Sequence, residues 1–191
     1  MAATIVVIAR HSVSLQEMGF TEWRRGAAWG GVLFVLTTVV LGVGALMPVF
    51  SEMYHDRRVG SGTVTFIYQA FIRIPFGTAV LEETAFRAVL PALFAVRWGV
   101  LRGSIVASVC FGLWHVLPSL GLAKVNPAAT RIFGSGHAGV VAAVVFAVVG
   151  TGLAGLWWCW IRYRARSVLA TMIAHVATNS VAYTIAWFVT R

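Results

Sequence analysis

The stretch from Ala27 to Phe50 contains no charged residue, and this run constrains the chain more than any other feature. Crossing the hydrocarbon core of a bilayer as an α-helix takes about 20 predominantly apolar residues, so this run is expected to span a membrane. Of the 191 residues, 59% are hydrophobic and 11% are charged, whereas soluble domains carry about 25% charged residues. We therefore expect an all-α, polytopic integral membrane protein, with residues 27–191 as a single membrane domain.

Further apolar stretches bring the predicted number of transmembrane helices to about six. The stretch 63–81 contains Arg73, which either snorkels or neutralises a carboxylate, and Pro75, which is expected to kink or break the helix. The other predicted spans are 82–96, 103–120, 137–160 and 167–189, with a polar loop at 51–62 and a Gly-, Pro-, Asn- and Ser-rich loop at 121–136. Small residues recur every four positions in the fifth span, which favours close approach of another helix; they are Gly139, Ala143, Ala147, Thr151 and Gly155.

Residues 1–26 hold a short apolar run, Thr4–Ala9, and then a mixed stretch that ends in Glu22-Trp23-Arg24-Arg25. The run is too short to span and lacks a basic leader, so we expect an interfacial segment rather than a cleaved signal peptide. The net charge of +9 is not gathered into a patch with interleaved aromatic residues; basic residues instead mark the ends of apolar runs. This pattern argues against nucleic acid as a partner and favours anionic lipid head groups of the bilayer.

Two adjacent glutamates, Glu82 and Glu83, interrupt the apolar pattern, although the chain contains only six acidic residues. An ionisable side chain costs on the order of 2.5–3.5 kcal/mol or more at the centre of a bilayer, and such residues are usually functional. Glu83 and Arg87 are four residues apart and can pair along one helix, while Glu82 points about 100° away from Glu83. The spacing indicates one carboxylate held by arginine and one left free to act.

Three more polar side chains, His115, His175 and Asn179, lie inside predicted spans. His175 and Asn179 are four residues apart and therefore share a helical face. Counted from the helix ends at 1.5 Å per residue, these groups can approach Glu82 within a core about 30 Å thick. Each group alone is explained by hydrogen bonding between helices, but together they predict a polar site inside the membrane.

The segments Glu82-Glu83-x-x-x-Arg87, Phe111-x-x-x-His115 and His175-x-x-x-Asn179 resemble, in order and spacing, the three motifs of the CAAX-protease and bacteriocin-processing family. This family, also called Abi, is related to the eukaryotic CAAX prenyl endopeptidase, and the resemblance covers about residues 76–185. It implies a metal-independent, cofactor-free intramembrane endopeptidase that cleaves a membrane-associated peptide or protein with a glutamate-activated water.

The resemblance also implies a role for each motif residue. Glu82 would be the general base, and His115 would help to orient and deprotonate the water. His175 and Asn179 would bind the carbonyl oxygen, and Glu83 with Arg87 would hold the motif in place. Such a site supplies the base and the oxyanion donors that peptide hydrolysis needs.

Alternatives with the same residues stay open. A glutamate and two histidines make a reasonable zinc set, although the chain has no His-Glu-x-x-His motif. An immunity or scaffold protein would bind a peptide without cutting it, and a proton-coupled transporter is disfavoured because no inverted repeat is evident. Lys124 is the only lysine among 15 basic residues, which hints at a bacterial source and so at the cytoplasmic membrane.

Overall fold

A computed structural model describes residues 1–57, 59–60 and 62–191, so Arg58 of the predicted polar loop lies outside the described residues. Every regular element of the described part is helical, which confirms the all-α prediction. The elements are α1 (Ala2–Ala9), α2 (Trp23–Leu46), α3 (Pro48–Ser51), η1 (Glu52–Tyr54), α4 (Thr63–Tyr68), η2 (Gln69–Ala79), α5 (Val80–Glu83), η3 (Thr84–Val89), α6 (Leu90–Trp114), α7 (Val116–Ser119), α8 (Leu122–Val125), α9 (Pro127–Phe133), α10 (His137–Ala165), α11 (Val168–Val176), η4 (Ala177–Val181) and α12 (Ala182–Val189). η1 is a 3₁₀-helix, and η2, η3 and η4 are π-helices.

Within the described residues, four helical runs are long and apolar enough to cross a membrane, and the protein is an integral membrane protein. These runs are Trp23–Leu46, Thr63–Trp114, His137–Ala165 and Val168–Val189. The predicted count of about six spans is not confirmed. The reason lies between residues 63 and 114, where a single helical run replaces most of three predicted spans.

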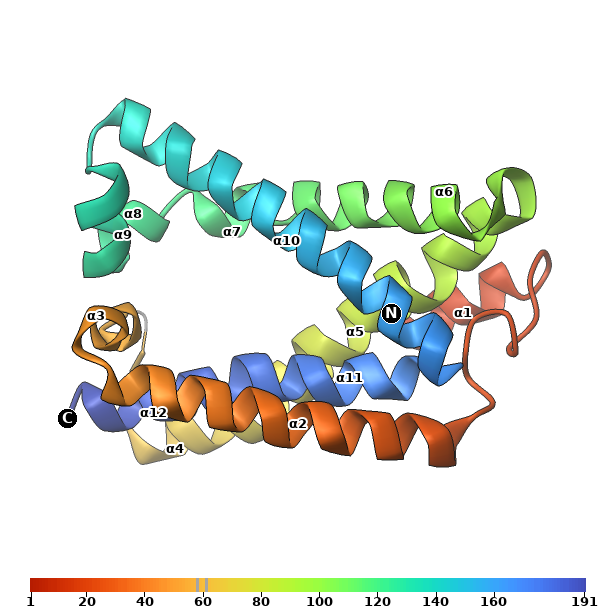
Figure 1. The fold of residues 1–191 in the computed structure, drawn as a ribbon, viewed down its shortest axis with the longest axis horizontal. Helices are drawn as coiled ribbons and strands as arrows, with labels where there is room; N and C mark the ends of the chain where they lie inside the picture. Colours follow the sequence, from red (N-terminus) through yellow and green to blue (C-terminus); the bar gives the residue numbers. More distant parts are fainter. Residues whose placement is uncertain (58, 61) are drawn as a thin grey trace.

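This long run, from Thr63 to Trp114, folds back at Gly99, whose φ of 78° and ψ of 165° are not helical. Glycine adopts a positive φ at little cost because it has no Cβ. The two legs then pack tightly, since a Cβ on Gly103 would come within 2.8 Å of the Ala95 nitrogen and 3.0 Å of the Pro91 oxygen. Figure 1 shows the second leg as the main part of α6, running back along the top of the molecule.

The helix is not broken at Pro75, although the sequence predicted a kink or break there. Proline lacks an N–H group and clashes with the carbonyl of residue i−4 in an α-helix. Pro75 lies inside the π-helix η2, where hydrogen bonds run from i to i+5 and the turn is wider. The predicted spans 63–81 and 82–96 therefore form one continuous leg, and 103–120 belongs to the returning leg.

Several other predicted boundaries differ from the observed ones. α2 covers Trp23–Leu46 rather than 27–50, because Pro48 begins the separate helix α3. The predicted span 103–120 is interrupted at His115, which separates α6 from α7. The predicted loop 121–136 contains the short helices α8 and α9, and α10 continues five residues beyond 160 to Ala165.

Figure 1 shows α6 along the top of the molecule and α2, α11 and α12 along the bottom, with α10 running obliquely from the top down to α11 and the leg that carries α5 rising between the two layers. α10 packs mainly against α6, and α11 packs against α2. In the first pair, a Cβ on Gly155 would lie 3.1 Å from the Phe111 ring and 3.4 Å from the Ser108 side chain. Gly155 belongs to the predicted row of small residues. Because it lacks a Cβ, it allows the close approach of α6 and α10 that such a row favours.

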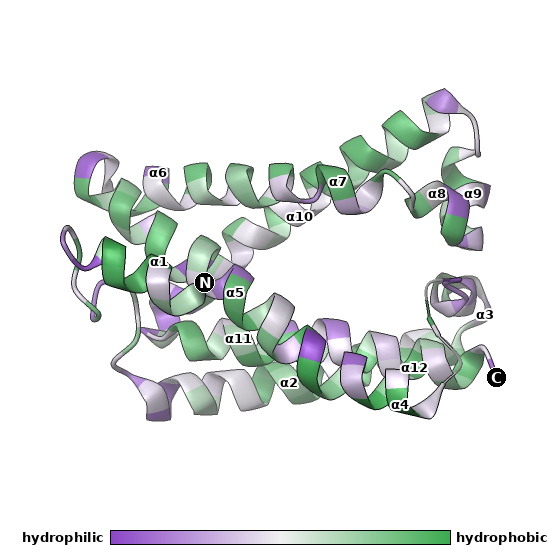
Figure 2. Cartoon of the chain, turned by 180° about the vertical axis from the view of Figure 1, so that it is seen from behind, coloured by the Kyte–Doolittle hydropathy of each residue, from purple (hydrophilic) through white to green (hydrophobic). Residues whose placement is uncertain are grey.

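Large apolar side chains cover the outer faces of the long helices. Val35, Leu36 and Val40 of α2 are each more than half exposed, as are Phe146 and Val149 of α10. Figure 2 shows hydrophobic residues along the long helices and hydrophilic residues gathered mainly at the helix ends and around α5. An exposed apolar band of this extent is expected where lipid replaces water as the solvent.

The amino-terminal residues pack on the membrane helices. Ala9, Val13 and Met18 form a buried cluster with Ala88 and Val89 of η3, and Ala92 and Val168 complete it. This cluster places the amino-terminal segment directly behind the π-helix that follows the two glutamates. The interfacial placement predicted for residues 1–26 stays a prediction.

Hydrogen bonds close the loop that joins α1 to α2. The Ser14 amide and hydroxyl donate to Glu17 Oε2 over 2.7 and 2.8 Å, and the Glu17 amide donates to Ser14 Oγ over 3.1 Å. These bonds hold the pKa of the exposed Glu17 carboxyl below its ordinary value, because they favour the charged form. The buried Arg162 donates to the Glu17 carbonyl, and the Val168 amide donates to the Gly19 carbonyl over 2.9 Å. The loop is thereby tied to the turn between α10 and α11.

Candidate active site

The His175 ring lies between the two adjacent glutamates. Its Nδ1 is 2.8 Å from Glu83 Oε1, a hydrogen bond, and its Nε2 is 3.9 Å from Glu82 Oε2. All three residues are buried, with 0% of Glu83, 4% of His175 and 9% of Glu82 exposed. Two neighbouring residues can reach both edges of one ring because successive helical positions point about 100° apart. Three of the predicted site residues are therefore in direct contact.

Arg87 brings a buried positive charge to Glu83. Its Nε is 3.4 Å from Glu83 Oε2, so the pair predicted from the spacing of four is present. None of the Arg87 side-chain nitrogens has a hydrogen-bond partner among the described residues. Instead, the guanidinium lies 3.7 Å from the centroid of the Phe111 ring and 5.1 Å from that of Trp158. Cation–π contact with two rings stabilises a charge that is excluded from water.

Glu82 has a separate partner, Trp114 of α6, which the sequence patterns did not single out. The indole Nε1–H of Trp114 donates to Glu82 Oε1 over 3.1 Å. The other oxygen, Oε2, has no hydrogen-bond partner among the described residues and is the one that faces His175. The sequence feature that could have identified Trp114 is its position directly before His115 in the second motif.

His115 joins the site through Phe111. Its Nδ1 lies 2.8 Å from the Phe111 carbonyl oxygen. Because a carbonyl only accepts, Nδ1 carries the proton, and Nε2 is an acceptor when the ring is neutral. The Phe111 ring, which lies under Arg87, also meets the His115 ring edge-on at 4.6 Å. Within the described part of the chain, His115 makes no hydrogen bond or ion pair with Glu82 or His175.

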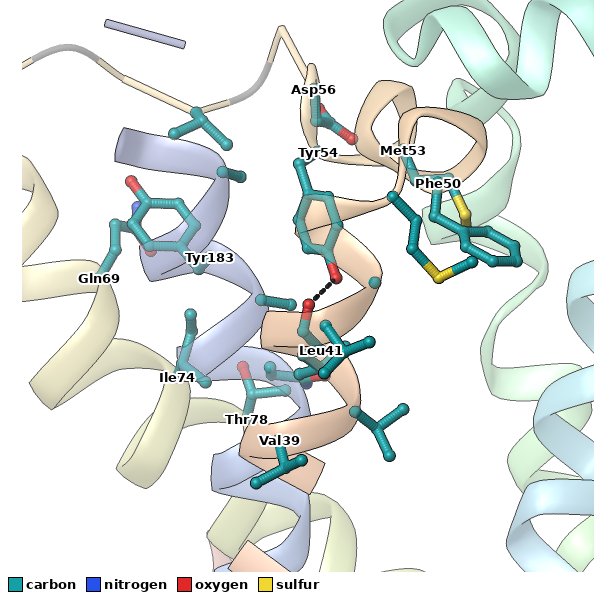
Figure 3. Close-up of a pocket in the computed structure, with 18 of the residues that line it drawn as sticks. Val39, Leu41, Phe50, Met53, Tyr54, Asp56, Gln69, Ile74, Thr78 and Tyr183 are labelled. Carbon is teal, nitrogen blue, oxygen red and sulfur yellow. Dashed lines mark hydrogen bonds between the residues drawn. The ribbon is translucent and has the colours of Figure 1, made fainter. Parts of the chain in front are cut away.

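Asn179 lines a cavity of about 1100 Å³ between α2, η2 and α12. Figure 3 shows its wall, with Tyr54 and Asp56 at one end and Val39 and Thr78 at the other. The glutamates and histidines of the site are not among the residues that line it. Asn179 therefore lies on the cavity wall, one helical turn beyond His175.

The described residues contain no group of three or more His, Cys, Asp or Glu side chains arranged to hold a metal ion. The zinc set considered from the sequence needs Glu82, His115 and His175 together. The His115 ring is held on the Phe111 carbonyl and makes no hydrogen bond or ion pair with Glu82 or His175 among the described residues. The structure thus does not gather these three side chains as a set of zinc ligands.

Comparison with known proteins agrees with the motifs. Residues 39–181 match the family described as type II CAAX prenyl endopeptidase Rce1-like, and this stretch contains the three motifs and the cavity-lining part of η2. No curated protein and no solved structure matches the chain. Because the match covers well over half of the 191 residues, the chain belongs to the Rce1-like family of type II CAAX prenyl endopeptidases, a protease family.

Proposed function

We propose that this protein hydrolyses a peptide bond of a membrane-associated peptide or protein, with Glu82 as the general base. The observation that carries the proposal is the position of the His175 ring, 2.8 Å from Glu83 Oε1 and 3.9 Å from Glu82 Oε2. A buried carboxylate with one unpartnered oxygen beside an imidazole is suited to acid–base hydrolysis. Membership of a protease family supports a peptide bond as the target.

The attacking water binds at Glu82 Oε2 in this proposal. The 3.9 Å between that oxygen and His175 Nε2 is too long for a direct hydrogen bond and allows one water to contact both atoms. Trp114 fixes the carboxylate through Oε1, and His115 helps to orient the water. As the water oxygen bonds to the carbonyl carbon, Glu82 takes a proton and then delivers it to the leaving nitrogen when the C–N bond breaks.

Charge that develops on the carbonyl oxygen needs donors aimed at it. In its protonated form, His175 donates Nδ1–H to Glu83 and presents Nε2–H to the substrate oxygen, while the Asn179 amide supplies a second donor. Glu83, itself paired with Arg87, fixes the ring and compensates its charge. Hydrolytic triads likewise use a third group to orient the catalytic histidine.

The test compares membrane and secreted peptides from cells that make the wild-type protein or Glu82→Gln. Product termini that depend on the wild-type protein should fall by about a hundredfold or more in the variant. Glu22→Gln, which changes an exposed glutamate before α2, is the matched control and should leave them unchanged. Cleavage by Glu82→Gln at the wild-type rate overturns the assignment.

Two further results point to other functions. Activity that a strong chelator abolishes and zinc restores indicates the zinc-dependent reaction. Full function of variants that lack both Glu82 and His115 indicates an immunity or peptide-binding protein. The bacterial cytoplasmic membrane and an interfacial role for residues 1–26 remain predictions.

A further inference from the structure

The segment that follows α2 and the segment that precedes α10 meet at one end of the molecule, where Figure 1 shows α8 and α9 opposite α3. The buried Asn126 joins the two segments, because its amide donates to the Met53 carbonyl over 2.8 Å. Its Oδ1 accepts from the Ala129 amide over 3.2 Å. The Arg57 amide donates to the Val125 carbonyl over 3.1 Å. These bonds hold Arg57 beside α8 and α9.

A pocket of about 320 Å³ lies at this junction. Its lining residues are Arg57, Lys124, Val125, Pro127, Thr130 and Arg131. Three of these six residues carry a positive charge, and they come from both segments. Small-molecule sites have volumes of about 300–1,000 Å³, so this pocket suits a small anionic group.

Two of the three cations have no acidic partner. Arg131 is paired with Glu52, whose Oε1 lies 2.6 Å from the Arg131 Nη2. Neither Arg57 nor Lys124 forms an ion pair with a carboxylate in the described part of the chain. Asp56 has an interaction of its own and lines the other cavity. Two cations thus line the pocket without a carboxylate paired to them, and both side chains are exposed to an incoming ligand.

The pocket lies at the level expected for lipid head groups. α2 and α10 are both long and apolar enough to cross a membrane. The pocket residues follow the end of α2 at Leu46 and precede the start of α10 at His137. Ile132, which directly follows Arg131, is largely exposed and suits contact with lipid. Basic pockets at the ends of membrane helices bind phosphate-bearing head groups.

We propose that this pocket binds a phosphate group, carried by an anionic lipid or present as free phosphate. The Arg57 guanidinium donates paired, charge-assisted hydrogen bonds to two phosphate oxygens, and the Lys124 ammonium acts as a point charge. A phosphate offers more acceptor oxygens than a carboxylate, which suits cations from two segments. None of the pocket residues belongs to the candidate active site, so the inference does not depend on the proposed hydrolysis.

Isothermal titration of the wild-type protein in a neutral detergent, with the detergent alone as the blank, is the test. The probes are inorganic phosphate, dihexanoylphosphatidic acid and dihexanoylphosphatidylcholine. At least one of the first two should bind about tenfold or more tightly than the phosphatidylcholine, whose ammonium offsets the phosphate charge. Tighter binding of the phosphatidic acid than of inorganic phosphate identifies a lipid as the source, whereas equal or weaker binding identifies free phosphate.

Arg57→Gln combined with Lys124→Gln should weaken binding of the tighter probe about tenfold or more. The unfolding temperature without ligand should stay close to that of the wild type, because both side chains are exposed. Arg97→Gln combined with Arg102→Gln is the matched control, since it removes two exposed positive charges of α6 that do not line the pocket. Binding of neither phosphate probe, equally tight binding of the phosphatidylcholine, or equal affinities of the two double variants overturns the inference.

Discussion

Glu83 has more ionisable partners than its neighbour Glu82. It accepts a hydrogen bond from His175 and is the ion-pair partner of Arg87. Replacing one member of a buried charge pair leaves the other uncompensated and costs about 3–5 kcal/mol. We therefore expect Glu83→Gln to lower the free energy of unfolding by about 3–5 kcal/mol. The same variant should also lose activity. Thermal unfolding in detergent checks the stability.

Glu82→Gln provides the contrast, because Glu82 has no guanidinium partner among the described residues and its Oε1 accepts from a neutral indole. The variant should lose activity and keep an unfolding temperature close to that of the wild type. Equal loss of stability in the two glutamine variants would contradict the division of roles between the glutamates.

Trp114 positions the proposed base from a different helix. Trp114→Phe keeps a large ring but removes the donor to Glu82 Oε1. Hydrogen bonds to charged groups contribute about 1.5–3 kcal/mol, so we expect the cleavage rate to fall roughly tenfold to hundredfold. Rates of peptide release measure the effect. Trp157→Phe, which changes another half-exposed tryptophan, should have little effect, and a similar loss there would contradict a specific role of Trp114.

Residue spacing predicted the pair within one helix, and depth along the helices predicted that His175 can approach Glu82, but neither identified the bonded atoms or the role of Trp114. The Glu83–Arg87 pair follows directly from a separation of four. The bond from Trp114 to Glu82 joins residues 32 positions apart, and His175 is 92 positions from Glu83. Those contacts depend on how the helices cross, and no local pattern encodes the crossing.

The π-helices are the elements that distinguish this site from an ordinary helix bundle. η2 ends three residues before Glu82, η3 begins directly after Glu83, and η4 begins two residues after His175. Widened turns of this kind are rare and occur frequently at functional sites. Pro75 was the single sequence signal of irregularity in this leg, and hydrophobic periodicity does not separate π-helical from α-helical turns. The sequence therefore predicted these helices without their distortion.

Packing of α2 on α11 places His175. A Cβ on Gly30 of α2 would lie 2.7 Å from the Ile173 side chain, two residues before His175. Gly30→Val should therefore push the two helices apart, lower the free energy of unfolding by about 1–3 kcal/mol and reduce activity. Unfolding temperature and cleavage rate are the measurements.

Gly31→Val supplies the control on the same helix. Nothing lies within 4 Å of a Cβ built on Gly31, so its substitution should change neither quantity. If both valine variants behave alike, loss of glycine from α2, rather than contact with α11, explains the effect.

At the scale of the whole molecule, the amino-terminal segment supports the site from behind. Met18 is fully buried against the cluster that includes Ala88 and Val89 of η3. Met18→Ala should lower the free energy of unfolding by about 2–5 kcal/mol, because it leaves a cavity in the core. Chemical unfolding in detergent measures this loss. Ile8→Ala, at a residue that is 67% exposed, should cost far less; similar losses would contradict a core role for Met18.

Composition predicted the membrane class and the all-α architecture, while the path of the chain needed the structure. A long apolar stretch interrupted by Arg73, Pro75 and the glutamates has the same hydropathy pattern whether it forms one continuous leg or two spans. The reversal at Gly99 is equally hard to predict, because glycines are common in membrane helices. Topology here depends on tertiary contacts such as that of Gly103 with Pro91.

The pairing of Glu83 with Arg87 also has a consequence for biosynthesis. Trp158 and His175 follow these residues in the chain, so the ribosome makes them much later. While the leg enters the bilayer, the Glu83 and Arg87 charges can offset one another within one turn, which reduces an insertion cost of about 2.5–3.5 kcal/mol per charge. Glu82 meets its imidazole only when α11 has been inserted. A nascent chain should therefore have no hydrolytic activity until α11 has joined the bundle.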